Sequence, residues 1–222
     1  MSRQSIAIIG GTGPQGRGLA YRLATSGHEV ILGSRDEERA RSAADELAVR
    51  LPPAACISGA TNLEAVRKAE VVLLAVPYDG HDELVASLRD VVEGKIVISC
   101  VNPLGFDKQG PFGLDVPTGS AAESAAALLP GSAVIGAFHH LSAVTLITDE
   151  ELLEDVLVVG DDEAAKDVVI ELARSVTGRP GIAAGRLRLA RQLEPLTAVL
   201  ISVNRAYKAH SGIRVTGLRP VV

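Results

Sequence analysis

A glycine-rich loop that follows a short apolar run constrains this 222-residue chain more than any other feature of its sequence. Residues 6–9 are wholly apolar, as in a strand that is buried on both faces. Gly11, Gly13 and Gly16 follow with the spacing G-x-G-x-x-G and lead into a segment of helical periodicity that stops at Gly27. In this setting the glycines allow a tight turn and a close approach of the backbone to a pyrophosphate. The loop therefore predicts a dinucleotide site within a strand–helix–strand unit.

The predicted site in this loop consists of consecutive residues, because backbone N–H groups at the start of the helix face the phosphates. These residues are Gly11, Thr12, Gly13, Pro14, Gln15 and Gly16.

The alternation of strand and helix patterns in the first hundred residues predicts an α/β fold with a doubly wound parallel sheet. Short β-branched runs alternate with longer helical patterns, and such repeated units imply right-handed crossovers with helices on both faces of the sheet. We expect a Rossmann-type nucleotide domain over residues 1–150 and a smaller C-terminal lobe over residues 151–222 that completes a cleft. The expected strands of the first half, after the opening one, lie at residues 28–32, 54–58, 71–76 and 95–99.

The pattern changes after residue 99. Residues 100–120 are rich in glycine and proline and show no period, which predicts a functional loop or lid without regular structure. A strand is expected over residues 152–159, followed by a helix that Asp161 and Asp162 cap. The last helical pattern, over residues 186–210, is expected to be interrupted near Pro195. Its wide apolar stripe packs on the nucleotide domain or forms a dimer contact, and periodicity alone leaves both open.

Composition excludes several classes of function. The chain carries a formal net charge of −5, no tryptophan and only 3% aromatic residues, which argues against binding of nucleic acid. No run of 18 apolar residues predicts a membrane span, and no secretory signal opens the chain. Cys56 and Cys100 are isolated, as expected of thiols in a reducing compartment. We therefore expect a cytoplasmic protein whose partners are small molecules, with no nucleic-acid or membrane partner.

The end of the second strand predicts which nucleotide binds. Enzymes that use NAD place a carboxylate there to bind the ribose 2′-hydroxyl, whereas this chain has Gly33, Ser34 and Arg35. A serine hydroxyl and an arginine suit a phosphate, since charge-assisted bonds of this kind contribute about 1.5–3 kcal/mol each. Arg39, one helical turn later, and Thr12 add further donors. The sequence therefore predicts NADP.

The residues expected at the reacting end of the site are uncharged. In a doubly wound sheet, ligands lie outside the carboxyl ends of the strands, which here are Val76-Pro77 and Asn102-Pro103. No acid–base pair or nucleophile accompanies them. Hydride transfer suits such a site, because it requires stacked rings, a dry pocket and good orientation more than proton transfer.

Several of these segments together resemble the coenzyme F420-dependent NADP reductases. The resemblance implies reversible hydride transfer between NADPH and the deazaflavin coenzyme F420, with the deazaflavin held between a Rossmann domain and a C-terminal lobe. It also suggests a homodimer. The segments that carry it are residues 10–20, 32–35, 75–77, 138–140 and 210–214.

The resemblance implies roles for individual residues. Thr12, Ser34, Arg35 and Arg39 match contacts to the 2′-phosphate, and Val76, Asn102 and Ala143 match the nicotinamide side. His139 and Leu141 match the catalytic segment that faces the reacting rings, and Ile213 lies where the C-terminus approaches the deazaflavin.

The histidine pair His139-His140 leaves two interpretations open. One of the two side chains could donate a proton or a hydrogen bond to the deazaflavin, since neighbours in an extended segment point to opposite faces. A neutral structural histidine is the other possibility.

Two other functions also fit the chain. One is a different NADP-dependent reductase, resembling imine reductases or metalloreductases. The other is a non-catalytic, NADP-binding redox sensor. Asp161 and Asp162 lack a third ligand, so we expect them to start a helix and do not expect a metal site.

Overall fold

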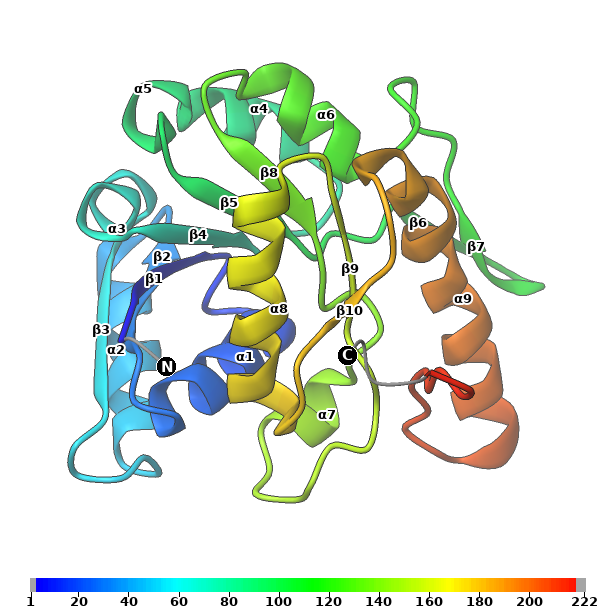
Figure 1. Ribbon diagram of the computed structural model, residues 1–222. Coiled ribbons are helices and arrows are strands. Elements are labelled where there is room, and N and C mark those ends of the chain that lie inside the picture. The colour runs from blue at the N-terminus through cyan, green and yellow to red at the C-terminus, as the bar shows by residue number, and fades with distance from the viewer. Residues whose placement is uncertain (1–2, 219–222) are drawn as a thin grey trace.

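The protein, described here by a computed structural model over residues 3–218, is built on one eight-stranded sheet (Figure 1). The strand order is β10-β9-β8-β5-β4-β1-β2-β3, and all neighbours are parallel except β8 and β9. The doubly wound α/β class is confirmed. The strands of this sheet are β1 (Ser5–Ile9), β2 (Glu29–Ser34), β3 (Cys56–Thr61), β4 (Val71–Leu74), β5 (Ile96–Ser99), β8 (Ala133–Gly136), β9 (Leu157–Gly160) and β10 (Ile182–Ala183).

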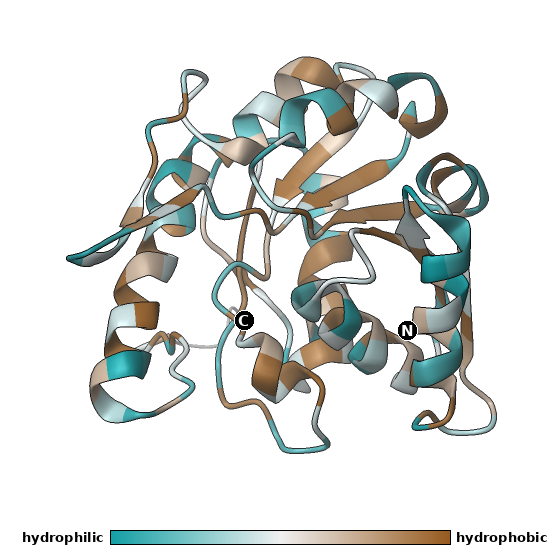
Figure 2. Cartoon of the chain, turned by 180° about the vertical axis from the view of Figure 1, so that it is seen from behind, coloured by the Kyte–Doolittle hydropathy of each residue, from teal (hydrophilic) through white to brown (hydrophobic). Residues whose placement is uncertain are grey.

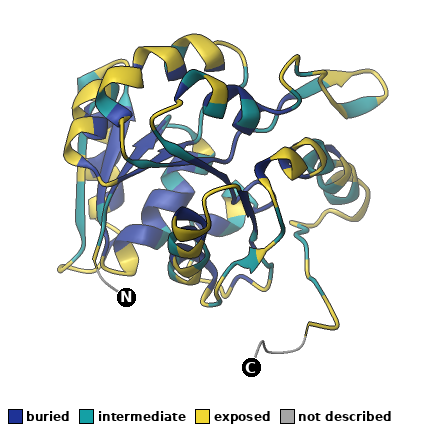
Figure 3. Cartoon of the chain, turned by 45° about the horizontal axis from the view of Figure 1, so that its top comes forward, coloured by how far each residue is buried: buried dark blue, intermediate teal, exposed yellow. Residues whose placement is uncertain are grey.

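Helices cover both faces of the sheet, and strand residues alternate between two apolar cores. Ile6 and Ile8 pack in one core with residues of α1, α2 and α8, whereas Ala7 and Ile9 pack in the other with residues of α3 to α6. Apolar residues accordingly dominate the central strands, which are buried (Figures 2 and 3). The helices are α1 (Pro14–Thr25), α2 (Glu37–Ala48), α3 (Asn62–Lys68), α4 (His81–Ser87), α5 (Arg89–Val92), α6 (Ala121–Leu128), α7 (Ala143–Leu146), α8 (Glu163–Thr177) and α9 (Ala190–Tyr207), with a 3-10 turn η1 (Leu187–Leu189).

The strand register brings the carboxyl ends of the central strands to one edge. Ile9 pairs with Leu74, and Leu74 pairs with Ser99, which in turn pairs with Gly136. The chain leaves β1, β4, β5 and β8 at this common level, so the four following loops meet there. Such an edge is where doubly wound sheets bind ligands.

The expectation of an irregular loop over residues 100–120 is wrong in part. It contains an antiparallel hairpin of β6 (Leu104–Asp107) and β7 (Gly110–Gly113), which forms a separate two-stranded sheet. The side chain of Asp107 accepts hydrogen bonds from the N–H groups of Gln109 and Gly110, and Gly110 has a φ of +124°. A carboxylate and a glycine thus make the turn, although the strands themselves lack an alternating apolar pattern.

The expected interruption of the last helix near Pro195 is also wrong, because α9 runs through this residue. The proline removes one backbone hydrogen bond, but its ring packs on the hairpin, where a Cβ on Gly113 would lie 2.7 Å from the Pro195 Cβ. The strand expected from residue 152 begins only at Leu157, whereas Asp162 caps α8 as expected.

The proposed boundary at residue 150 stays a prediction. The sheet includes β9 and β10, which lie beyond that boundary, and the outer end of α9 and the hairpin are exposed (Figure 3). In residues 3–218, no helix is both long and apolar enough to cross a bilayer.

Candidate active site

In the loop between β1 and α1, packing requires glycine at positions 10 and 16 but not at position 13. Gly10 has a φ of +81°, and a Cβ on it would lie 2.5 Å from the carbonyl oxygen of Ala75. A Cβ on Gly16 would lie 2.6 Å from the carbonyl oxygen of Gly10. A Cβ on Gly13, in contrast, would meet only Gly10 O at 3.4 Å, an ordinary contact. Packing leaves Gly13 free to be another residue, so its bare backbone suits a ligand that approaches closely.

The first turn of α1 is open to an anion. Gly13 is its N-cap and offers no side chain, and Pro14 occupies the first turn. The positive end of the helix is therefore not satisfied by a side-chain cap. The Gln15 side chain donates to the carbonyl of Phe138 at 3.3 Å, so it ties the loop to the end of β8.

A pocket of about 720 Å³ begins at this loop and extends past the ends of β2, β3 and β4. Among the described residues, Arg35 and Arg39 line this pocket without any ion pair to an acidic group. Ser34 Oγ accepts the N–H of Asp36 at 3.2 Å, which leaves its hydroxyl hydrogen available to a ligand. We call this space the nucleotide pocket. The predicted site residues that line it are Thr12, Gly13, Ser34, Arg35, Arg39, Val76 and Pro77.

Two further residues explain why the end of β2 has no carboxylate. A Cβ on Gly33 would lie 2.7 Å from Ile9 Cδ1 and 2.9 Å from Asn62 Oδ1, so a larger residue there would displace the ends of these two side chains. Asp36 caps α2 by accepting the N–H of Arg39 at 3.2 Å. Its carboxylate is thus engaged at the helix start, which suits a phosphate better than a ribose diol in the nucleotide pocket.

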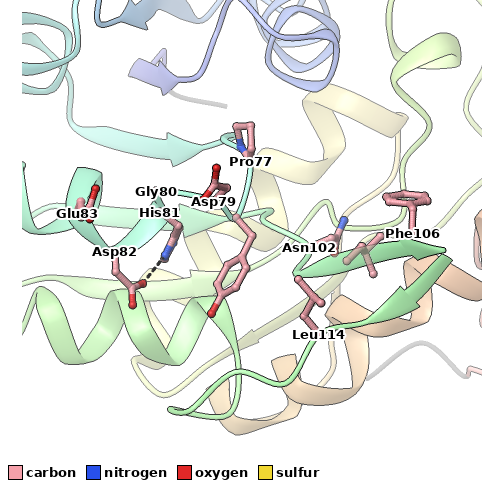
Figure 4. Close-up of a pocket in the computed structure, with 11 residues that line it drawn as sticks. Pro77, Asp79, Gly80, His81, Asp82, Glu83, Asn102, Phe106 and Leu114 are labelled. Carbon is pink, nitrogen blue, oxygen red and sulfur yellow. Dashed lines mark hydrogen bonds and ion pairs between the residues drawn. The ribbon is translucent and has the colours of Figure 1, made fainter.

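A second pocket of about 710 Å³ adjoins the first, and the two share Pro77, Asp79, Gly80 and Glu83. We call it the hairpin pocket. One wall carries acidic side chains from the turn before α4 and from α4 itself, and the opposite wall carries apolar side chains from the β6–β7 region (Figure 4). The remaining lining residues are Tyr78, His81, Asp82, Asn102, Leu104, Phe106 and Leu114.

Asn102 lines the hairpin pocket and is anchored by its side chain. Its Nδ2 donates to the carbonyl oxygen of His139 at 3.0 Å, and Thr197 Oγ1 on α9 donates to the same oxygen at 3.2 Å. The His139 carbonyl therefore links the loop after β5, the segment after β8 and α9.

The His139 side chain itself lies in the interior, with only 4% of the residue exposed. Burial, with a smaller contribution from His140, lowers the pKa of His139 to about 3, so its imidazole is neutral at pH 7. It lies beside Gly136, where an added Cβ would be 3.3 Å from His139 Cε1. His140 donates from Nε2 to the carbonyl of Leu193 at 2.7 Å, and burial lowers its pKa as well. His140 therefore has the features of the neutral structural alternative. The imidazole of His139 is buried and neutral, but its Nε2 has no hydrogen-bond partner within residues 3–218.

Comparisons with known proteins agree with this geometry. The family model described as "NADP oxidoreductase coenzyme F420-dependent" matches residues 5–103. The F420-dependent NADP reductase of Methanothermobacter thermautotrophicus is 41% identical over 220 residues, which cover 96% of this chain and 95% of that protein. This chain belongs to the family of F420-dependent NADP reductases.

Two further relatives help to define the place of the chain in this family. A solved structure from Arthrobacter sp. FB24, described as belonging to the same group, superposes with a TM-score of 0.79 and 29% identity, over 93% of this chain and 96% of that one. Metalloreductase STEAP3 of Rattus norvegicus is 32% identical over 86% of this chain, but the match spans only 36% of that protein. Identity and coverage both favour the F420-dependent group.

Several residues that the resemblance assigns to the site of this family lie outside the two pockets. Leu141 is 5% exposed and belongs to the core. Ala143 begins α7, near Gly18 of α1. Pro103, which was expected from the strand end and not from the resemblance, is buried and lines neither pocket. Ile213 lines a separate pocket of about 380 Å³ with Thr145 and Glu150–Glu154, and its carbonyl accepts the N–H of Asp155 at 2.8 Å. Their roles stay predictions.

Other residues of the site were not found by sequence reasoning. Asn62 follows Thr61, which is the N-cap of α3, and its position at the end of β3 could have pointed to the nucleotide pocket. In the sequence, Asp79 and Glu83 are indistinguishable from the acidic residues that commonly begin a helix, so no pattern assigned them to a pocket. The hairpin residues Phe106 and Leu114 gave no signal, because only tertiary packing brings them opposite α4.

Proposed function

We infer that the protein transfers a hydride reversibly between NADP(H) and coenzyme F420. The observation that carries this proposal is the junction of two pockets at Pro77, one of which holds two arginines without acidic partners. Membership of the family supports the same assignment.

The nucleotide pocket fits NADP(H) from end to end. Arg35, Arg39 and Ser34 bind the 2′-phosphate through charge-assisted hydrogen bonds, and the open first turn of α1 binds the pyrophosphate. Val76 and Pro77 then line the nicotinamide end of the pocket.

The hairpin pocket fits the deazaflavin. Its apolar wall of Leu104, Phe106 and Leu114 offers a flat aromatic ring a surface that excludes water. When both coenzymes are bound, NADPH supplies a hydride and oxidised F420 accepts it together with a proton from solvent. The protein contributes orientation, which can lower a barrier by about 7–11 kcal/mol.

His139 acts as a positioning residue in this proposal. A neutral, buried imidazole cannot serve as the proton donor, but the backbone carbonyl of His139 holds Asn102 in the wall of the hairpin pocket. Leu141 supports the same segment from the core.

The deciding experiment is to mix the protein with NADPH and oxidised F420 and follow the absorbance of the oxidised deazaflavin. We expect bleaching with NADPH and much slower bleaching with NADH. Tight binding of NADPH without any turnover would favour a redox sensor. Turnover of an imine, with none of F420, would favour the other class of reductase.

We also propose a cytoplasmic homodimer that associates through α9. Val199 on this helix is 55% exposed, whereas Leu193 and Ala198 pack inward, so the apolar stripe has a free side. Sedimentation of the protein should give twice the monomer mass, and Val199→Glu should shift it toward the monomer. A monomeric parent protein would refute this proposal.

A further inference from the structure

The C-terminal part of the chain has an unusual charge. Residues 186–214 carry six arginine or lysine residues and a single acidic residue, Glu194, although the whole chain has 22 basic and 27 acidic residues. Glu194 is buried and accepts the N–H groups of Ala121 and Ala122, so it does not offset the surface charge. Arg186 and Arg191 pair with Asp161 and Glu123 near the start of α9, so their charges are offset. The basic surface at the outer end of α9 therefore consists of Arg205 and Lys208.

Arg205 connects this basic surface to the hairpin pocket. Its guanidinium lies over the Phe106 ring, with Cζ 5.9 Å from the ring centroid. Phe106 is 61% exposed and lines the hairpin pocket, so Arg205 stands at the rim of that pocket. Lys208, the left-handed C-cap of α9, is exposed three residues further on. Over residues 3–218, neither Arg205 nor Lys208 makes an ion pair.

The opposite wall of the hairpin pocket has the opposite charge. Asp79, Asp82 and Glu83 lie there, facing the side from which Phe106 and Leu114 project (Figure 4). The carboxylates of this wall repel a polyanionic chain that leaves the pocket. Arg205 and Lys208, which lie beyond Phe106, attract it. The favourable interaction of a cation with a helix C-terminus accounts for a basic residue in the last turn, but it does not account for the contact with Phe106.

We propose that Arg205 and Lys208 bind the anionic side chain of the deazaflavin coenzyme, the phosphodiester and glutamate carboxylates beyond its ribityl chain. The proposal rests on the assignment of the deazaflavin to the hairpin pocket. The ring lies between the acidic wall and the hairpin, and the side chain leaves past Phe106 along the end of α9. These two cations thereby favour the complete coenzyme over its bare chromophore.

The test compares two ligands by equilibrium fluorescence titration in the absence of NADP(H): oxidised F420, and the 8-hydroxy-5-deazaflavin that carries only its ribityl chain. Arg205→Glu and Lys208→Glu should each weaken binding of F420 about tenfold at low ionic strength, because each reversal removes an attraction and adds a repulsion. Binding of the bare chromophore should stay within about twofold. Arg205→Lys keeps the charge and should retain most of the preference for F420.

Arg67→Glu in the last turn of α3 is the matched control, since it makes the same charge change at an exposed residue that lines neither pocket. Its F420 affinity should equal that of the parent protein, and every variant should keep the parent affinity for NADP. Equal losses for both ligands, or no loss for F420, would overturn the assignment of Arg205 and Lys208. Failure of the parent protein to bind either deazaflavin would instead refute the proposed function itself.

Discussion

At the scale of single residues, the nucleotide pocket depends on two missing side chains and on one arginine without an acidic partner. The backbone at Gly13 is bare although packing would permit a side chain, and the end of β2 has Gly33 in place of a carboxylate. Arg35 is left without an acidic partner among the described residues and is available to a phosphate.

Replacement of Arg35 tests the phosphate assignment. We expect Arg35→Ala to raise the KM for NADPH by about 10–100-fold and to change kcat little, since it removes binding shared by the ground and transition states. Steady-state kinetics should show no such change for Arg41→Ala, whose arginine pairs with Glu37 on α2. Equal affinities of the parent protein for NADH and NADPH would contradict the assignment.

Two alanine substitutions separate the roles of the loop glycines. Gly13→Ala should leave the melting temperature nearly unchanged but abolish measurable NADP binding, because only the ligand approaches that position closely. Gly16→Ala should lower the melting temperature, since its Cβ would lie 2.6 Å from Gly10 O. Thermal unfolding and calorimetric titration of both variants check this. Normal NADP binding by Gly13→Ala would refute the proposed contact.

At the scale of elements, α9 is joined to the rest of the molecule by a few specific contacts. Pro195 packs on the hairpin, Thr197 donates to the His139 carbonyl, and Glu194 accepts the first N–H groups of α6. The Glu194 contact is sensitive to pH, because burial raises the pKa of Glu194 to about 7 although its two hydrogen bonds oppose this shift.

Glu194 therefore predicts a pH dependence of stability. The folded protein binds a proton at Glu194 more tightly than the unfolded chain, so the free energy of unfolding should fall by roughly 3 kcal/mol as the pH rises from about 4.5 to 7. Denaturant unfolding across this range should show the slope in the parent protein. Glu194→Gln should lose it, whereas Glu171→Gln, an exposed control on α8, should keep it.

At the scale of the whole molecule, two pockets meet at one edge of one sheet. The nucleotide pocket approaches Pro77 from the β1–α1 side, and the hairpin pocket adjoins it toward Asn102 and the hairpin. In the proposed arrangement, the two coenzymes meet at the residues that the pockets share and stack there ring against ring.

This arrangement predicts transfer of hydrogen from one face of the nicotinamide. With NADPH deuterated at either prochiral position of C4, only one of the two samples should deliver deuterium to F420, as measured by mass spectrometry of the reduced coenzyme. Comparable delivery from both samples would contradict a single stacked geometry.

The sequence by itself determined the α/β class, the glycine loop, the Ser34-Arg35 turn and the cap at Asp162, because each depends on residues close together in the chain. Tertiary structure alone decided the rest. The hairpin, the continuity of α9 through Pro195, the neutral state of His139 and the wall opposite Asp79 all depend on burial and on contacts between distant segments. Such contacts leave no local period or spacing from which a sequence pattern could predict them.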